Sequence, residues 1–438
     1  MEAITANDPL TPLLTRRMTT ATVRTMMQRR AEFSCDLEAA LTGVAMSPDA
    51  RARLDGALDR VWPTSTQVYG ARVPEVIIGS GFHAAVYAAG RVRAGLPKPL
   101  VLERGPRAGG VFAQPGGPAF YLNSRNRPGG LGLAGDQGIN PNYLPGAPIQ
   151  TANLSVGDYQ TNDDMAFIIR LTLARYADVV TDYEVVSVQG SGTYRLDAAD
   201  GSYVRARRVI DARGVGDPKG GEDANGRNVV TFPQFMQRMA GVWPLRGVRR
   251  AAVIGGGDAA RCAIEALLGL GPQPPMTIPM LDSVERVDAY GQLPTTCERW
   301  AEAERGRYAP IGRFLRADRY GTRRLNVTRT RSARAVALAD TALVRGRAYD
   351  LVVIATGSRD DGLTGLPIDD FQPYSFGGVP LAQRQGNVWR VGPCANLPFT
   401  GEEENGGVAD IENNRVSMFR LASKTATLAA TLPSPRGL

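Results

Sequence analysis

Residues 73–113 read VPEVIIGSGFHAAVYAAGRVRAGLPKPLVLERGPRAGGVFA, and this stretch decides the fold. Its pattern predicts a strand at 76–78, a tight glycine turn, a helix over about 82–94 and a second strand at 100–102. A strand, a glycine turn, a helix and a parallel strand in this order form the unit that binds dinucleotides. The rest of the chain is therefore interpreted around this unit.

The turn GSGFHA has small residues at the three positions of a GxGxxA fingerprint. Gly79 permits the sharp turn, Gly81 lets the backbone approach a pyrophosphate, and Ala84 lets the helix pack closely on the strand. The positive dipole end of the helix then faces the phosphates. Glu103 ends the second strand, where a carboxylate accepts hydrogen bonds from ribose hydroxyls. His83, the only histidine, opens the helix beside the pyrophosphate, with direct contact to cofactor or substrate as the alternative.

A second copy of the unit lies at 248–270, VRRAAVIGGGDAARCAIEALLGL. Gly255, Gly257 and Ala260 take the same three positions, and Asp258 is expected to help cap the helix. The unit thus repeats within one chain.

Two further apolar strands run into glycine turns, RVIDARG at 208–214 and YDLVVIATG at 349–357. This order resembles the flavoproteins with two dinucleotide-binding domains, which include the flavin-containing and N-hydroxylating monooxygenases and the reductases related to thioredoxin reductase. The resemblance implies FAD on the first unit and NADPH or NADH on the second.

The predicted fold class is α/β, with two Rossmann-like domains in which a NAD(P) domain interrupts the FAD domain. Residues 1–72 form an N-terminal helical extension that covers the flavin domain or builds a homodimer contact. The FAD domain takes 73–217 and 358–438, and the NAD(P)-binding-like domain takes 218–357.

Composition excludes several other classes. No apolar run approaches the roughly 18 residues that a membrane span needs, and the start MEAITANDPL has no signal-peptide pattern, so we expect a cytoplasmic protein without a membrane partner. The net charge of +8 comes with no basic run interleaved with aromatic residues, which argues against a nucleic-acid partner. Four scattered cysteines without a CxxC pair, and a single histidine, exclude a disulfide framework, the redox pair of a thioredoxin reductase and a multi-histidine metal centre.

The segment after Glu103 is rich in Gly, Pro and Asn and too long to be a mere connection. Gly109, Gly110, Val111 and Phe112 resemble the GG-x-aromatic turn that passes along the flavin ring in the monooxygenase relatives. The polar residues that follow are our candidates for the wall of the active site, with a solvated loop as the alternative interpretation. The candidate catalytic residues are Asn123, Arg125, Asn142 and Tyr143.

The resemblance also implies cofactor contacts, and two positions depart from it. Val185 takes the place of the backbone contact to adenine. Arg213 lies where the relatives usually have ATG, and it either brings a cation near the FAD phosphates or faces solvent. Gly392 is followed by Pro393, where the reductases have an aspartate on the ribityl chain. The full set of expected cofactor-binding residues is Gly79, Ser80, Gly81, Phe82, His83, Ala84, Glu103, Arg104, Gly110, Val111, Phe112, Val185, Ala212, Arg213, Gly214, Gly255, Gly257, Asp258, Ala260, Thr356, Gly357 and Gly392.

The strand after the second helix, around 284–289, ends in neither a clear carboxylate for a free ribose hydroxyl nor a clear arginine for a 2'-phosphate. Arg286, Arg299, Arg305 and Arg307 are candidates for the latter, with surface residues as the alternative. The choice between NADH and NADPH stays open, and so does a degenerate second domain.

The function expected first is an FAD enzyme that takes a hydride from a nicotinamide and uses O2 to hydroxylate a small organic substrate. The Baeyer-Villiger fingerprint FxGxxxHxxxW is absent from the sequence. The alternatives are a flavin oxidase, dehydrogenase or cyclase whose nicotinamide domain is degenerate, and a flavin-binding partner protein without turnover.

Overall fold

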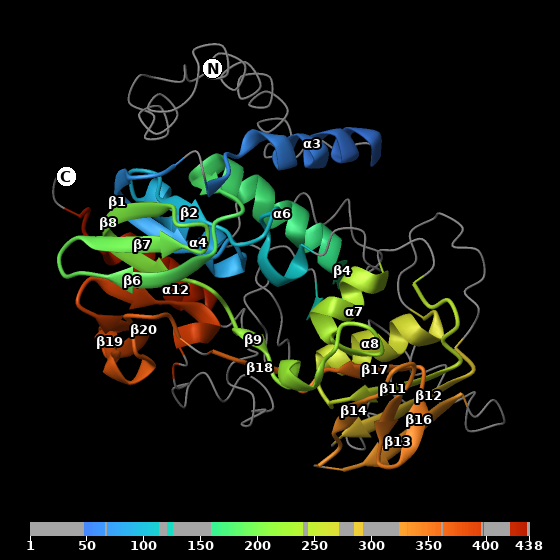
Figure 1. The fold of residues 1–438 in the computed structure, drawn as a ribbon. Coiled ribbons are helices and arrows are strands. Elements are labelled where there is room, and N and C mark those ends of the chain that lie inside the picture. The colour runs from blue at the N-terminus through green and yellow to red at the C-terminus, as the bar shows by residue number, and fades with distance from the viewer. Residues whose placement is uncertain are drawn as a thin grey trace.

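The computed structural model describes residues 48–65, 68–113, 121–125, 159–239, 244–270, 284–291, 324–330, 332–360, 362–395, 397 and 421–435. In this part of the chain two sheets lie side by side, each with helices on one face, and two short strands cross between them (Figure 1). The α/β architecture with two Rossmann-like domains is thereby confirmed.

The first domain is built on a sheet of nine described strands with its long parallel strand β1 near the middle. The order along the main path is β19-β20-β21-β8-β1-β2-β5, and β6 and β7 extend it from β8 as an antiparallel hairpin. The strands are β1 (Ala71–Ile78), β2 (Leu100–Leu102), β5 (Asp178–Val180), β6 (Val185–Gln189), β7 (Tyr194–Ala198), β8 (Tyr203–Asp211), β19 (Gln372–Phe376), β20 (Val379–Gln385) and β21 (Val388–Arg390).

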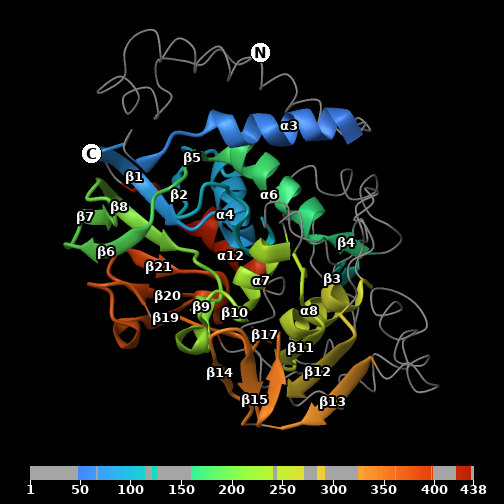
Figure 2. The same ribbon diagram turned by 45° about the vertical axis from the view of Figure 1, so that its right-hand side comes forward.

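Helices of the first domain cover one face of this sheet. α4 (Phe82–Arg93) packs between α6 (Asn162–Tyr176) and α12 (Ala422–Thr431). α3 (Pro48–Val61) lies along the outer side of α6 (Figure 2). Eight of the nine residues in FHAAVYAAG are buried, because α4 has neighbours on both sides. They are Phe82, His83, Ala84, Ala85, Val86, Tyr87, Ala88 and Ala89.

The second domain has a parallel sheet in the order β10-β17-β11-β12-β13. Its strands are β10 (Val229–Thr231), β11 (Arg250–Ile254), β12 (Arg286–Gly291), β13 (Leu325–Arg329) and β17 (Leu351–Ile354). Helices α7 (Phe232–Met239) and α8 (Asp258–Leu268) share one apolar core with one face of this sheet. The antiparallel strands β14 (Ala335–Ala337), β15 (Ala342–Val344) and β16 (Arg347–Tyr349) share a second core with the other face.

The two domains are joined by the strands β9 (Asp217–Pro218) and β18 (Ser358–Arg359), which pair antiparallel. Gly216 has φ +81°, and a Cβ there would collide with the carbonyl oxygen of Arg359. The close approach of the two crossing segments therefore requires glycine. The domain limits expected at 217–218 and 357–358 fall at these strands and stay predictions.

Short elements complete the described chain: β3 (Tyr121–Arg125) pairs with β4 (Tyr159–Thr161), and 3-10 turns lie at η2 (Gly110–Phe112), η4 (Gly221–Asp223), η6 (Ile368–Asp370) and η7 (Gly392–Ala395). None of the helices in the described ranges combines the length and apolar character that a bilayer span requires.

Candidate dinucleotide sites

The first glycine loop follows β1 and leads into α4. Gly79 has φ +89°, and a Cβ on it would lie 3.0 Å from the carbonyl oxygen of Ala212, in the turn after β8. Gly81 is the N-cap residue of α4, and no side chain caps this helix. Because Gly81 has no side chain to cap the helix, the positive dipole at the N-terminal end of α4 suits an anion.

The segment after β2 folds back onto this loop. A Cβ at Gly110 would lie 2.7 Å from the Cα of Gly81, so the two glycines are in backbone contact. The amide of Gly109 donates hydrogen bonds to the carbonyl oxygen of Ser80, at 3.2 Å, and to its hydroxyl, at 3.1 Å. The glycine turn at 109–110 and the loop at 79–81 thus form one backbone assembly.

Glu103 ties the end of β2 to the same loop. Its Oε2 accepts hydrogen bonds from the amide of Ser80, at 3.1 Å, and from the Ser80 hydroxyl, and its Oε1 accepts one from the amide of Gly105, at 2.8 Å. A carboxylate has about four acceptor positions, so three are used within the protein. The predicted contact with ribose would use the remaining one.

His83 is buried at the meeting point of three segments. Its Nδ1 lies 2.9 Å from the hydroxyl of Thr425, in α12, and that hydroxyl donates to the carbonyl oxygen of Leu421. A Cβ at Gly392 would lie 2.6 Å from the imidazole ring, so the turn after β21 rests on the ring itself. The histidine joins α4 to the C-terminal helix across 342 residues of sequence.

The second glycine loop repeats the geometry of the first. Gly255 has φ +143°, and a Cβ on it would collide with the carbonyl oxygen of Ala355. Gly257, and not Asp258, is the N-cap residue of α8, and a Cβ there would meet nothing within 4 Å. Ala260 is fully buried against the sheet. A second helix N-terminus is thus left uncapped beside an open glycine.

Strand register shows where the second loop differs from the first. Ile78 pairs with Leu102 before Glu103, and Ile254 pairs with Tyr290 before Gly291. Gly291 therefore takes the position of Glu103. A Cβ there would lie 2.5 Å from the carbonyl oxygen of Gly255, so no carboxylate-bearing residue fits.

The fold was compared with known proteins. Neither the protein-family models nor the curated proteins match the sequence. An ornithine N-hydroxylase from Kutzneria sp. 744, in a complex with reduced FAD, NADP+ and L-ornithine, has a similar structure: the TM-score is 0.53 at 16% identity, over 82% of this chain and 98% of that one. The FAD-bound cadaverine monooxygenase of desferrioxamine biosynthesis in Erwinia amylovora gives a TM-score of 0.52 at 11% identity, over 83% of this chain and 95% of that one. This chain has the fold of the flavoproteins with two dinucleotide-binding domains. The resemblance expected from the sequence is confirmed at the level of the fold.

In this two-domain flavoprotein fold, the turn after β8 is held by two carboxylates and two arginines. The guanidinium of Arg213 donates to both oxygens of Asp211, at 2.9 Å each, and to Asp360, at 3.3 Å. Arg390 lies 3.4 Å from Asp211 and also pairs with Asp360. Asp211 is buried, which by itself opposes ionisation, but Arg213 and Arg390 outweigh this and lower its pKa below the usual range.

The side chain of Arg213 therefore does not simply face solvent, and its predicted place near the FAD phosphates stays a prediction. Its guanidinium is bound by Asp211 and Asp360 and donates to the carbonyl oxygen of Gly362 at 2.9 Å. Asp360 directly follows β18, so this cluster fastens the returning crossover to the end of β8. This cluster could not be predicted from the sequence, because Asp360 and Arg390 lie far from Arg213 in the chain.

Four other residues that were predicted to contact FAD differ in how deeply they are buried. Phe112 packs into the core of the first domain with α4 and α6, whereas the Val111 side chain is 46% exposed. Val185 opens β6 and is buried. Arg104 makes an exposed ion pair with Asp217 at 3.0 Å. Their contacts with a flavin stay predictions.

The candidate catalytic residues lie largely outside the described part of the structure. Asn123 and Arg125 belong to β3, but only the backbone of that strand is described. Asn142 and Tyr143 lie outside the described residues, and so do Arg299, Arg305 and Arg307. The side chain of Asp258 is likewise not described.

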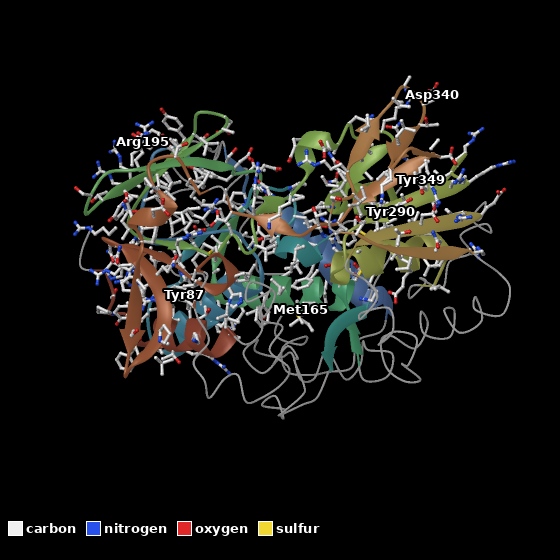
Figure 3. The ribbon with its side chains drawn as sticks, turned by 90° about the horizontal axis from the view of Figure 1, so that it is seen from below. Tyr87, Met165, Arg195, Tyr290, Asp340 and Tyr349 are labelled. Atoms are coloured by element: carbon white, nitrogen blue, oxygen red, sulfur yellow. The ribbon has the colours of Figure 1, made fainter. Side chains whose placement is uncertain are left out.

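Arg286 is wrongly placed for the 2'-phosphate clamp considered above. It begins β12, at the opposite end from Gly291, and its Nε donates to Asp288 at 3.0 Å. Asp288 is fully buried and accepts from the Tyr349 hydroxyl at 2.6 Å, which lies 2.5 Å from that of Tyr290. Figure 3 shows the two tyrosines close together in the second domain. This cluster fastens the antiparallel strands to the parallel sheet.

Thr356 and Gly357, also predicted to bind cofactor, follow β17. The Thr356 hydroxyl donates to the carbonyl oxygen of Lys219 at 3.1 Å, and Gly357 has φ +91°.

Burial raises the pKa of the Cys394 thiol to about 12, with the nearby Asp211 adding to the shift. In the described ranges, no group of three or more His, Cys, Asp or Glu side chains is arranged to hold a metal ion.

Proposed function

We propose that this protein is an FAD-dependent oxidoreductase, and specifically an NAD(P)H- and O2-dependent monooxygenase that hydroxylates a small organic substrate. The observation that carries the proposal is the pair of helix N-termini at Gly81 and Gly257. Each follows a glycine, Gly79 or Gly255, that has a positive φ and packs closely on the backbone of a neighbouring turn. The similarity of the fold to two monooxygenases supports it.

The first glycine loop fits the pyrophosphate of FAD. Gly81 and Gly110 approach each other as bare backbone, and the uncapped N-terminus of α4 lies beside them. Glu103 holds the Ser80 amide in place and keeps one acceptor position for a ribose hydroxyl. Bound FAD would supply the electron and oxygen chemistry, and the protein's task is to bind it, orient it and exclude water.

The second glycine loop fits a nicotinamide dinucleotide. Gly257 is exposed, and α8 points its uncapped N-terminus at the same edge of the sheet. Ligands of open α/β sheets bind at the carboxyl ends of the strands, which is where both loops lie. Hydride transfer requires the two dinucleotides to meet, and the paired strands β9 and β18 connect the domains that hold them.

The substrate is proposed only as a small organic molecule. The two similar structures bear the names of an ornithine N-hydroxylase and a cadaverine monooxygenase, so primary amines are the first compounds to try. A cytoplasmic setting and a homodimer remain predictions from the sequence.

One set of measurements tests the proposal. We expect the purified protein to show flavin absorbance near about 370 and 450 nm, and to consume NADPH or NADH and O2 faster when an amine is added. Bleaching of the flavin by substrate alone, with no effect of either nicotinamide, would favour the oxidase or dehydrogenase alternative. A colourless protein that takes up no FAD would refute the proposal.

A further inference from the structure

The helix before the first glycine loop is an integral part of the flavin domain. Leu54 and Leu58 of α3 are buried, as is Trp62 just after it, and all three belong to the core cluster that contains α4 and α6. α3 lies along α6 in both ribbon views (Figure 1, Figure 2).

Two carboxylates of α3, one helical turn apart, bind two arginines. Asp55 pairs with the guanidinium of Arg170, in α6, and with that of Arg107. Asp59 also pairs with Arg170 and lies 3.2 Å from the Nε of Arg107. Arg170 is fully buried, and its Nη2 donates to the backbone carbonyl of Asp55 at 3.0 Å. Arg170 therefore anchors the helix, while Arg107 joins the helix to a different segment.

That segment is 103–112, which wraps around the first glycine loop. At its start, Glu103 binds the amide and hydroxyl of Ser80. At its end, Gly109 donates to Ser80 and Gly110 contacts Gly81. Arg107 lies between these two attachments, and its side chain is 23% exposed. The segment thus contacts the loop through the Glu103 carboxylate and through the backbone of Gly109 and Gly110, and the placing of these groups depends on the path of the segment.

We propose that Arg107, held by Asp55 and Asp59, is a positioning residue that shapes segment 103–112 for dinucleotide binding, and that α3 thereby controls the affinity of the first site. The inference deepens the proposed function and relies on FAD binding there. Arg107 acts through Gly109 and Gly110 and need not touch the ligand.

Arg107→Gln is the decisive variant, since it leaves Arg170 with both of its carboxylates. We expect the dissociation constant of FAD, measured by quenching of flavin fluorescence during titration of the full-length apoprotein, to rise at least tenfold. The increase in melting temperature on adding FAD should shrink accordingly, because ligand stabilisation depends on the ratio of concentration to dissociation constant. Arg107→Lys, which keeps the charge but not the forked geometry, should restore part of the affinity.

Asp217→Asn is the matched control. It breaks the exposed ion pair that Arg104, in the same segment, makes with Asp217. It should leave the FAD affinity unchanged, since exposed pairs contribute little. If Arg107→Gln binds FAD as tightly as the unmodified protein does, the inference is wrong. If the unmodified protein binds no FAD, the proposed function fails first.

Asp59→Asn is a second variant that tests the link between α3 and Arg107. Arg170 keeps a charged partner in this variant, because its ion pair with Asp55 remains. Combined with Arg107→Gln, Asp59→Asn should weaken FAD binding by less than the sum of the two single effects, since both remove the same link. Additive effects would contradict a pathway through Arg107.

Discussion

Gly291 lies against Gly255 at the strand position that Glu103 takes in the other domain, and a Cβ on Gly291 would lie 2.5 Å from the Gly255 carbonyl oxygen. At this position the second loop therefore has no carboxylate that could accept a ribose 2'-hydroxyl or repel a 2'-phosphate. Gly291 pairs with Arg329 at the end of β13, so a cationic residue stands on the next strand.

We expect NADPH to be preferred over NADH by at least tenfold in kcat/KM. Arg329→Gln should lower kcat/KM for NADPH and leave that for NADH nearly unchanged, as steady-state oxidation of both cofactors would show. Arg347→Gln, at an exposed position of β16, is the control. Equal use of NADH and NADPH would contradict this assignment.

Glu103→Gln tests the first loop. The amide has one acceptor oxygen where the carboxylate has two, and its NH2 group would face either the Ser80 or the Gly105 amide. Hydrogen bonds to a charged group contribute about 1.5–3 kcal/mol each. We therefore expect the dissociation constant of FAD to rise by about 10- to 100-fold in a fluorescence titration. Glu285→Gln, on an exposed side chain of the second domain, should have no effect; a similar loss there would show that the change in binding is not specific.

The local elements of both dinucleotide units were predictable from the sequence. The strand at 76–78 lies within β1, and the helix expected over 82–94 is α4, Phe82–Arg93. Both follow from short-range physics, because the apolar periodicity and the glycine spacing fix the strand, the turn and the helix.

The partners of the charged groups were not predictable. His83 binds Thr425, Arg107 binds Asp55, and Arg213 binds Asp360, each across a distance in sequence that only the tertiary fold closes. The sequence also could not show that Glu103 is already used by Ser80, since that contact depends on how the turn packs. Of the four candidate catalytic residues no side chain is described, so that prediction stands untested.

Glu75 tests how the C-terminal helix is held. Its carboxylate pairs with Arg91 at 3.0 Å and Arg208 at 2.8 Å, all three side chains being buried. The same arginines donate to the carbonyl oxygens of Leu432 and Pro433 at the end of α12. Glu75→Gln leaves two buried cations with neutral acceptors in place of the carboxylate, and removing one partner of a buried pair costs about 3–5 kcal/mol. Urea unfolding should show that loss, and Glu222→Gln, an exposed substitution, should not. A loss below about 1 kcal/mol would place the anchoring elsewhere.

Asp211 gives the protein a defined response to acid. Burial raises its pKa, but Arg213 and Arg390 lower it further than burial raises it, so the folded-state pKa lies below the unfolded value of about 3.9. A carboxyl group with a depressed pKa contributes stability that is present above its unfolded pKa and is lost as the pH falls through the folded one. In Asp211→Asn, we expect a free energy of unfolding about 3–5 kcal/mol lower at pH 7, because the buried Arg390 and the partly buried Arg213 then share Asp360 as their one carboxylate among the described residues. The difference from the unmodified protein should stay constant down to about pH 5 and narrow below about pH 4. Urea unfolding of both proteins between pH 7 and pH 3 measures this, and a difference that grows as the pH falls would mean that the folded-state pKa of Asp211 is raised and not lowered.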